Sequence, residues 1–151
     1  MPLPAILPFV LNAGRRLPAS LLILVVAFAG CGRSGPEIGR VAGLVTLDGR
    51  PLPEAFVYFR HEGGGRNSQA MTDDTGHYEL NYSGSEAGAI VGPNTVRITT
   101  FVAPNYDDSG KLIKGTGKKE VVPTRYNKQS ELKVEVKPGS NDLEFKLLTS
   151  G

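Results

Sequence analysis

VAGLVTLDGRPLPEAFVYF, which spans residues 41–59, contains two apolar runs separated by a turn. In the first run Val41, Val45 and Leu47 occupy odd-numbered positions, so they fall on one side of an extended chain. Asp48-Gly49 is typical of a tight turn, and the prolines that follow it exclude a helix. The segment therefore predicts two half-buried strands joined by a turn.

The same alternation continues toward the C-terminus, where each apolar run follows a turn. Residues 77–82 follow Asp-Asp-Thr-Gly, and residues 95–101 follow Gly-Pro-Asn. Apolar and charged residues alternate again over residues 132–137 and 143–147, and Pro-Gly-Ser-Asn at 138–141 separates these two runs. The last two runs therefore predict a terminal hairpin with one buried and one exposed face.

Helical periodicity is missing from residues 31–151. No apolar stripe recurs at helical spacing over the length that a helix requires, and 19 glycines and 11 prolines interrupt the chain at strand-like intervals. The 121 residues from Cys31 onward suit a single domain. Together these features predict an all-β fold, an antiparallel β-sandwich.

Two stretches carry a resemblance to a known family. Residues 41–57 and residues 72–80, which read TDDTGHYEL, resemble the carboxypeptidase regulatory-like domain, and residues 122–139 are similar to the tail of small bacterial lipoproteins built on it. The resemblance covers residues 39–148. It implies a transthyretin-like Greek-key sandwich of about seven strands in two sheets, with its glycines and prolines specifying the fold.

The N-terminal part of the chain has the pattern of a secretory signal. Two arginines, Arg15 and Arg16, precede an apolar run over residues 17–29. The single cysteine, Cys31, ends the stretch FAGC, which resembles the lipobox of bacterial lipoproteins. The resemblance implies that residues 1–30 are removed as a signal peptide and that the Cys31 sulfur carries a diacylglycerol.

A lipid anchor sets the expected organisation and location of the chain. Residues 31–38 are polar and glycine-rich, as in a flexible tether, and residues 39–148 form the domain. The 14 residues between Arg16 and Cys31 are fewer than the roughly 20 that cross a bilayer. A cleaved signal without lipid and a buried structural cysteine remain alternatives. With lipid, the domain lies outside the cytoplasm, on the periplasmic or cell-surface face of a bacterial membrane.

Charge and cysteine content bear on the partner and on stability. The chain has 17 Lys and Arg against 15 Asp and Glu, and two of the basic residues, Arg15 and Arg16, belong to the expected signal peptide. The remaining chain is electrically balanced, which gives no support for a nucleic-acid partner or a polybasic membrane patch. Once Cys31 is lipidated no thiol remains, so the core alone must hold the domain together.

Enzyme classes of this fold fit the residues poorly. A transthyretin-related hydrolase of 5-hydroxyisourate requires paired histidines, an arginine and a C-terminal Tyr-Arg-Gly-Ser, whereas this chain ends Leu-Thr-Ser-Gly. A zinc carboxypeptidase holds its metal in a separate catalytic domain, for which the chain has no room. His61 and His77, with Glu62, Asp73 or Asp74 as a further ligand, could form a metal site, but their expected places at strand ends favour exposed imidazoles. We expect no catalysis, metal or cofactor.

Two Asp-rich segments resemble fragments of calcium loops. They are Asp73-Asp74-Thr75-Gly76 and Asp107-Asp108-Ser109-Gly110. Neither has ligands at alternate positions closed by a glutamate, as an EF-hand requires. Tight turns use the same residue types for local side-chain hydrogen bonds, so we interpret both segments as turns.

The long connection over residues 102–119 is the candidate binding site. It exceeds the usual length of a structureless loop in a compact domain, and long loops on a rigid scaffold often carry binding residues. A solvated insertion without a partner is the alternative, because the charges of the loop are mixed. The candidate binding residues are Asn105, Tyr106, Asp107, Asp108, Lys111 and Lys114.

These features predict a non-catalytic module of the cell envelope, held to the membrane by its N-terminal lipid. Its further partner is an unknown envelope protein or a glycan. Glycan-binding modules usually present aromatic platforms, whereas this chain has no Trp, and several of its five Tyr residues are expected to be buried. The sequence therefore favours a protein-interaction or structural module, with a carbohydrate-binding module as the alternative.

Overall fold

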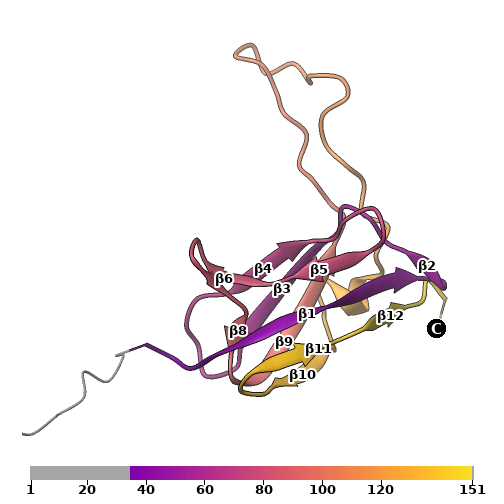
Figure 1. The fold of residues 1–151 in the computed structure, drawn as a ribbon. Coiled ribbons are helices and arrows are strands. Elements are labelled where there is room, and N and C mark those ends of the chain that lie inside the picture. Colours follow the sequence, from indigo (N-terminus) through magenta and orange to yellow (C-terminus); the bar gives the residue numbers. More distant parts are fainter. Residues whose placement is uncertain (1–34, 151) are drawn as a thin grey trace, which may run out of the picture. The chain divides into compact units, whose positions relative to one another are not determined.

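The computed structural model describes residues 35–150, which form two six-stranded β-sheets (Figure 1). The expected signal peptide, Cys31 and the first residues of the expected tether lie outside the described residues. Among residues 35–150, no helix is long and apolar enough to cross a membrane.

The first sheet is organised around its longest strand, β1 (Ile38–Leu47). Five strands pair with it: β2 (Arg50–Pro51), β5 (His77–Glu79), β8 (Ala89–Ile90), β11 (Ser140–Asp142) and β12 (Phe145–Leu147). The first three run antiparallel to β1, whereas β11 and β12 run parallel to it. Ala42 pairs with both Glu79 and Asp142, so β5 and β11 flank opposite edges of β1.

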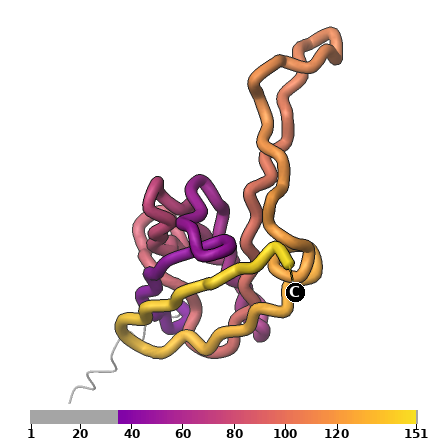
Figure 2. The backbone as a smooth tube through the Cα atoms, turned by 90° about the vertical axis from the view of Figure 1, so that its right-hand side faces the viewer, coloured from indigo at the N-terminus to yellow at the C-terminus, as the bar shows by residue number. Residues whose placement is uncertain are grey.

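The second sheet is antiparallel throughout. Its strands, in spatial order, are β10 (Lys133–Val136), β9 (Gly92–Thr99), β3 (Phe56–His61), β4 (Ser68–Met71), β6 (Asn81–Ser83) and β7 (Glu86–Ala87). Strand β9 is longer than its neighbours and is followed by a segment that extends away from both sheets before the 3-10 helix η1 (Thr124–Tyr126) (Figure 2).

One hydrophobic core lies between the two sheets. The Phe145 ring meets the Phe59 ring edge to face, with centroids 6.1 Å apart, and lies 6.2 Å from the Tyr78 ring. The Tyr78 hydroxyl donates a 2.8 Å hydrogen bond to the carbonyl of Leu143, and burial raises the pKa of that hydroxyl. The buried core side chains include Val41, Val45, Val57, Phe59, Tyr78, Leu80, Val96, Ile98, Val136, Phe145 and Leu147. The predicted all-β sandwich is confirmed.

The predicted terminal hairpin is wrong, although its alternation is right. Val136, Phe145 and Leu147 are buried, and the charged residues between the apolar positions are exposed. However, β10 pairs with β9 in the second sheet, while β11 and β12 pair with β1 in the first. The turn at Pro138-Gly139 therefore carries the chain from one sheet to the other, and both runs bury their apolar sides in the core between the sheets.

Residues 35–150 contain twelve strands, where about seven were expected. The expected strand over residues 77–82 is divided into β5, which pairs with β1, and β6, which pairs with β4. The break falls at Leu80, whose buried side chain belongs to the core that both sheets share. This apolar run therefore contributes one strand to each sheet, and the single expected strand corresponds to two observed strands.

Gly43 lets the C-terminal segment approach β1 closely. A Cβ atom at Gly43 would lie 2.0 Å from the carbonyl oxygen of Leu143, a distance that no side chain tolerates. The amide of Leu143 donates a 2.9 Å hydrogen bond to the carbonyl of Ala42 at the same point. The glycine is therefore required by the parallel pairing between β1 and the end of the chain.

Candidate functional site

The predicted binding loop is a two-legged arm, defined here as residues 101–121. Its legs are joined near the sandwich by two backbone hydrogen bonds between Val102 and Lys118, of 3.0 and 2.9 Å. Farther out, Tyr106 and Leu112 form a second antiparallel bridge. Figure 1 shows the arm extending from the end of β9, beyond both sheets. The arm is thus ordered by its own backbone contacts.

Asp107 closes the turn at the tip of the arm. One of its carboxylate oxygens accepts hydrogen bonds from the Ser109 hydroxyl at 2.6 Å, the Ser109 amide at 3.0 Å and the Lys111 amide at 2.9 Å. The bond from the Ser109 hydroxyl is the main cause of a lowered Asp107 pKa. Asp73 accepts the same set from Thr75 and His77. The interpretation of both Asp-rich segments as turns is confirmed.

Glu120 forms hydrogen bonds that join the two legs at the base of the arm. Its carboxylate accepts hydrogen bonds from the hydroxyl of Thr99, from the amide and hydroxyl of Thr100 at 3.0 and 2.9 Å, and from the amide of Val122 at 3.0 Å. Partial burial raises the pKa of Glu120, but these hydrogen bonds outweigh it and leave the pKa below its ordinary value. Lys118 adds an ion pair of 2.9 Å with Glu54.

The structure brings all six candidate residues together on the arm, in two different roles. The side chain of Asp107 and the backbone of Asn105 hold the arm itself: the Asn105 amide donates to the Thr116 hydroxyl at 2.9 Å, and the Asn105 carbonyl accepts from Ile113 at 2.9 Å. The remaining candidate side chains are exposed and available to a partner; they are those of Asn105, Tyr106, Asp108, Lys111 and Lys114.

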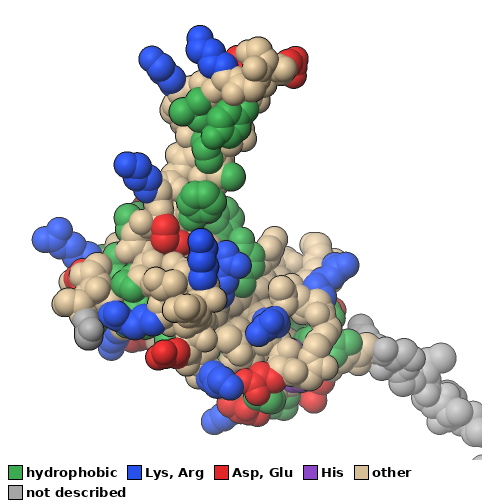
Figure 3. Space-filling model, turned by 180° about the vertical axis from the view of Figure 1, so that it is seen from behind, with side chains coloured by type: hydrophobic (Ala, Val, Ile, Leu, Met, Phe, Trp, Pro, Cys, Tyr) green, Lys and Arg blue, Asp and Glu red, His purple; other side chains and the backbone are tan. Residues whose placement is uncertain are grey.

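The apolar side chains of the arm were not predicted from the sequence. Six of the eight large apolar side chains that are exposed among residues 35–150 belong to it. We call this set the apolar strip: Phe101, Val102, Tyr106, Leu112, Ile113 and Val121. Figure 3 shows hydrophobic side chains along the arm, with charged side chains gathered at its tip. The adjacent pair Leu112-Ile113 within a polar loop was the signal available in the sequence.

The two histidines belong to different sheets. His61 ends β3 in the second sheet, where its Nδ1 accepts a 3.1 Å hydrogen bond from the Gly63 amide, and His77 begins β5 in the first sheet. Within residues 35–150 no three His, Cys, Asp or Glu side chains gather in a way that could hold a metal ion.

The expected burial of several tyrosines is wrong. Tyr78 is 1% exposed, whereas Tyr106 is 61% exposed and the other three tyrosines are half-buried. Tyr58 lies on a strand, yet its ring is on the outward side of the second sheet, because its neighbours Val57 and Phe59 point into the core. Aromatic side chains are therefore present at the surface, on the arm and on one sheet face.

Comparisons with known proteins bear only on the fold. No family model matches the chain, and no curated protein matches it. A 9R-lipoxygenase from Cyanothece PCC8801 is similar over 76% of this chain, with 12% identity and a TM-score of 0.43. A DUF3823 family protein from Parabacteroides merdae ATCC 43184 is similar over 75% of it, with 12% identity and a TM-score of 0.38. The chain spans 17% and 47% of the lengths of these two proteins.

Proposed function

We propose that this protein is a lipid-anchored, non-catalytic module of the cell envelope that binds a partner protein through the apolar strip of its arm. The observation that carries this proposal is the concentration of exposed apolar side chains on the arm. Exposed apolar side chains gathered on one element mark a candidate interaction site, because leaving them in water is unfavourable. Tyr106 would be a suitable anchor, since aromatic side chains dominate interface energetics.

The construction of the arm supports a role in recognition. Hydrogen bonds at its base, along its legs and at its tip already order its backbone. Binding a partner would therefore not carry the entropic cost of ordering the arm. Lys111 and Lys114 lie among the exposed residues of the arm and could form a polar rim around the apolar contact.

The position of the arm supports an anchor at the other end of the domain. Ile38, at the start of β1, pairs with Ile90, which lies just before the start of β9. The arm begins after Thr99 at the far end of the same strand. An eight-residue strand spans roughly 25 Å, so the base of the arm lies about that far from the end of the domain that the tether enters.

The family and topology remain part of the proposal. A carboxypeptidase regulatory-like sandwich with Greek-key order is supported by the glycine and turn positions of residues 41–57 and 72–80. Gly43 and Gly76 both occupy sites where a Cβ atom would meet backbone, at 2.0 and 2.5 Å respectively. Such glycines specify a fold, which agrees with a module that has no catalytic part.

Replacing residues 105–117 with a short Gly-Ser linker tests the arm. Stability should change little, since loop-closure entropy varies slowly with length, whereas arm-dependent capture of a protein from envelope extracts should disappear. Tyr106→Ser should reduce capture as well, while Leu148→Ser, which removes an exposed apolar side chain (52% exposed) away from the arm, should not. The captured protein is then purified and its binding to the wild type and the three variants is measured directly.

Equal binding of the purified partner to the wild type and the shortened chain would contradict the proposal. The interaction surface would then lie on a sheet face or an edge strand. The carbohydrate alternative depends on a different surface, the outward face of the second sheet, and is tested separately.

A further inference from the structure

The outward face of the second sheet carries a row of polar and aromatic side chains across four strands. Asn81 on β6 pairs with Gln69 on β4, Gln69 pairs with Tyr58 on β3, and Tyr58 pairs with Arg97 on β9. Residues paired across antiparallel strands share one face, so all four side chains point away from the core. With strands about 4.8 Å apart, the row is roughly 14 Å long.

Tyr58 and Arg97 hold each other in a defined arrangement. The Tyr58 ring stacks on the Phe56 ring, with centroids 6.2 Å apart and planes inclined by 20°. The Arg97 guanidinium lies 5.5 Å from the centroid of the same Tyr58 ring. Cation–π and stacking contacts restrict these side chains before any ligand arrives, which lowers the entropic cost of binding.

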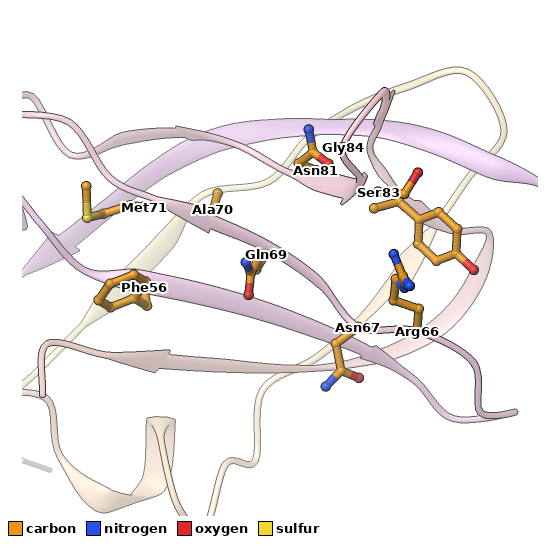
Figure 4. Close-up of a pocket in the computed structure, with 10 residues that line it drawn as sticks. Phe56, Arg66, Asn67, Gln69, Ala70, Met71, Asn81, Ser83 and Gly84 are labelled. Carbon is orange, nitrogen blue, oxygen red and sulfur yellow. The ribbon is translucent and has the colours of Figure 1, made fainter. Parts of the chain in front are cut away.

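A groove of about 610 Å³ adjoins one end of the row (Figure 4). It lies over β4 and β6, and Figure 4 shows Gln69 between Phe56 and Asn67. The side chains that line it combine aromatic rings, amides and a guanidinium; they include Phe56, Arg66, Asn67, Gln69, Asn81 and Tyr82. Amides both donate and accept hydrogen bonds, as the hydroxyl groups of a sugar do.

The arginines of this face are not neutralised by the chain. Within residues 35–150, Arg60, Arg66 and Arg97 form no ion pair with a carboxylate. Two nearby carboxylates have other partners: Glu62 binds Lys133 at 2.8 Å, with a further charge interaction with Arg60, and Glu120 accepts the hydrogen bonds at the base of the arm. The guanidinium groups of Arg66 and Arg97 in particular are therefore open to an anionic ligand, for which their planar donors suit carboxylates.

We propose that the outward face of the second sheet binds an acidic polysaccharide, a chain of sugar rings that bears carboxylates. Its sugar rings would pack their C–H faces on Tyr58 and Phe56, its hydroxyls would bond the amides of Gln69 and Asn81, and its carboxylates would bind the arginines. This site lies on the sheet, separate from the arm, so it stands or falls independently of the protein partner proposed above.

The test measures binding of the full-length chain, purified in mild detergent, to polygalacturonate by affinity electrophoresis and calorimetry. Polygalacturonate should bind, dextran should bind at least tenfold more weakly, and added salt should weaken binding because charges are screened. Arg97→Gln and Tyr58→Ala should each weaken binding about tenfold or more. Tyr58→Phe keeps the ring and should bind nearly as well as the wild type, which tests whether the ring or the hydroxyl carries the contact.

Two matched controls separate this site from the rest of the protein. Lys146→Gln removes an exposed cation from β12 in the other sheet, and the shortened arm removes the apolar strip; both should bind polygalacturonate like the wild type. Equal binding to dextran and polygalacturonate, unchanged binding by Arg97→Gln, equal binding to single-stranded DNA, or no binding to polygalacturonate would each overturn the proposal.

Discussion

Phe145 contributes to the core through aromatic contacts with residues from both sheets. It lies in β12 of the first sheet and contacts Phe59, which belongs to β3 of the second, as well as Tyr78 of β5. Its side chain is 6% exposed. The next residue, Lys146, points to solvent and forms only a surface ion pair of 3.2 Å with Glu144.

Phe145→Ala should lower the free energy of unfolding by about 3–5 kcal/mol, since it leaves a cavity between the sheets. Lys146→Ala should change it by no more than about 0.5 kcal/mol, as expected of a surface substitution. Urea denaturation of both variants makes the comparison. Similar losses at the two positions would show that the register of β12 is wrong.

Gly43→Ala should destabilise the domain by about 1–3 kcal/mol, because the added methyl group forces β1 and the chain near Leu143 apart. Gly84→Ala is the matched control: a Cβ atom there meets nothing within 4 Å, so its effect should stay within about 0.5 kcal/mol. Thermal and urea denaturation measure both. A neutral Gly43→Ala would contradict the close parallel pairing of β1 with the C-terminal strands.

Among the elements, the arm is joined to the sandwich by a hydrogen-bond network that includes one carboxylate. Glu120 ties the end of β9 to the return leg through Thr99, Thr100 and Val122, next to the backbone bonds between Val102 and Lys118. The ion pair between Lys118 and Glu54 is exposed and contributes little by comparison. The Glu120 carboxylate is therefore the titratable group in the network that holds the base of the arm.

Glu120→Gln should make the free energy of unfolding less dependent on pH than it is in the wild type. The folded state holds the pKa of Glu120 below the ordinary 4.5, so on acidification the unfolded chain takes up this proton first. The stabilisation is complete above pH 4.5 and is lost as the pH falls through the folded-state pKa. The wild type should therefore exceed the variant in stability at pH 7, and the gap should narrow in acid.

Urea titrations between about pH 3 and pH 7 measure this gap, because the midpoint of each titration reports stability at that pH. Glu135→Gln, on the exposed side of β10, provides the control and should follow the wild type throughout. A gap between wild type and Glu120→Gln that stays constant with pH would mean that the carboxylate does not hold the arm in its charged form.

For the whole molecule, the proposed lipid anchor would decide where the sandwich and its arm can act. Cys31→Ala should abolish labelling by a radioactive fatty acid and release the protein from the membrane fraction, because the lipid is the expected membrane contact. Cell fractionation and labelling check both outcomes, with the chain carrying Gly84→Ala as a control that keeps the cysteine. Membrane retention of the Cys31→Ala protein equal to that of the wild type would contradict the lipid anchor.

Local periodicity was predictable from the sequence because it depends only on residues that are close together along the chain. The burial of Val41 and Val45, the alternation through Val136 and Phe145, and the turns closed by Asp73 and Asp107 all depend on residues a few positions apart. A polar loop that was too long for a simple connection also indicated the arm; its candidate binding residues are exposed there, and their role in binding stays a prediction.

Which strands pair, and which side chains meet, depended on contacts between distant parts of the chain. Alternation states which side of a strand is apolar, but β10 and β12 could satisfy it either as one hairpin or in two sheets. Likewise, Tyr58 and Arg97 are separated by 39 positions and lie side by side only because β3 pairs with β9. Pairing of this kind follows from packing one shared core, and no short segment of the sequence encodes it.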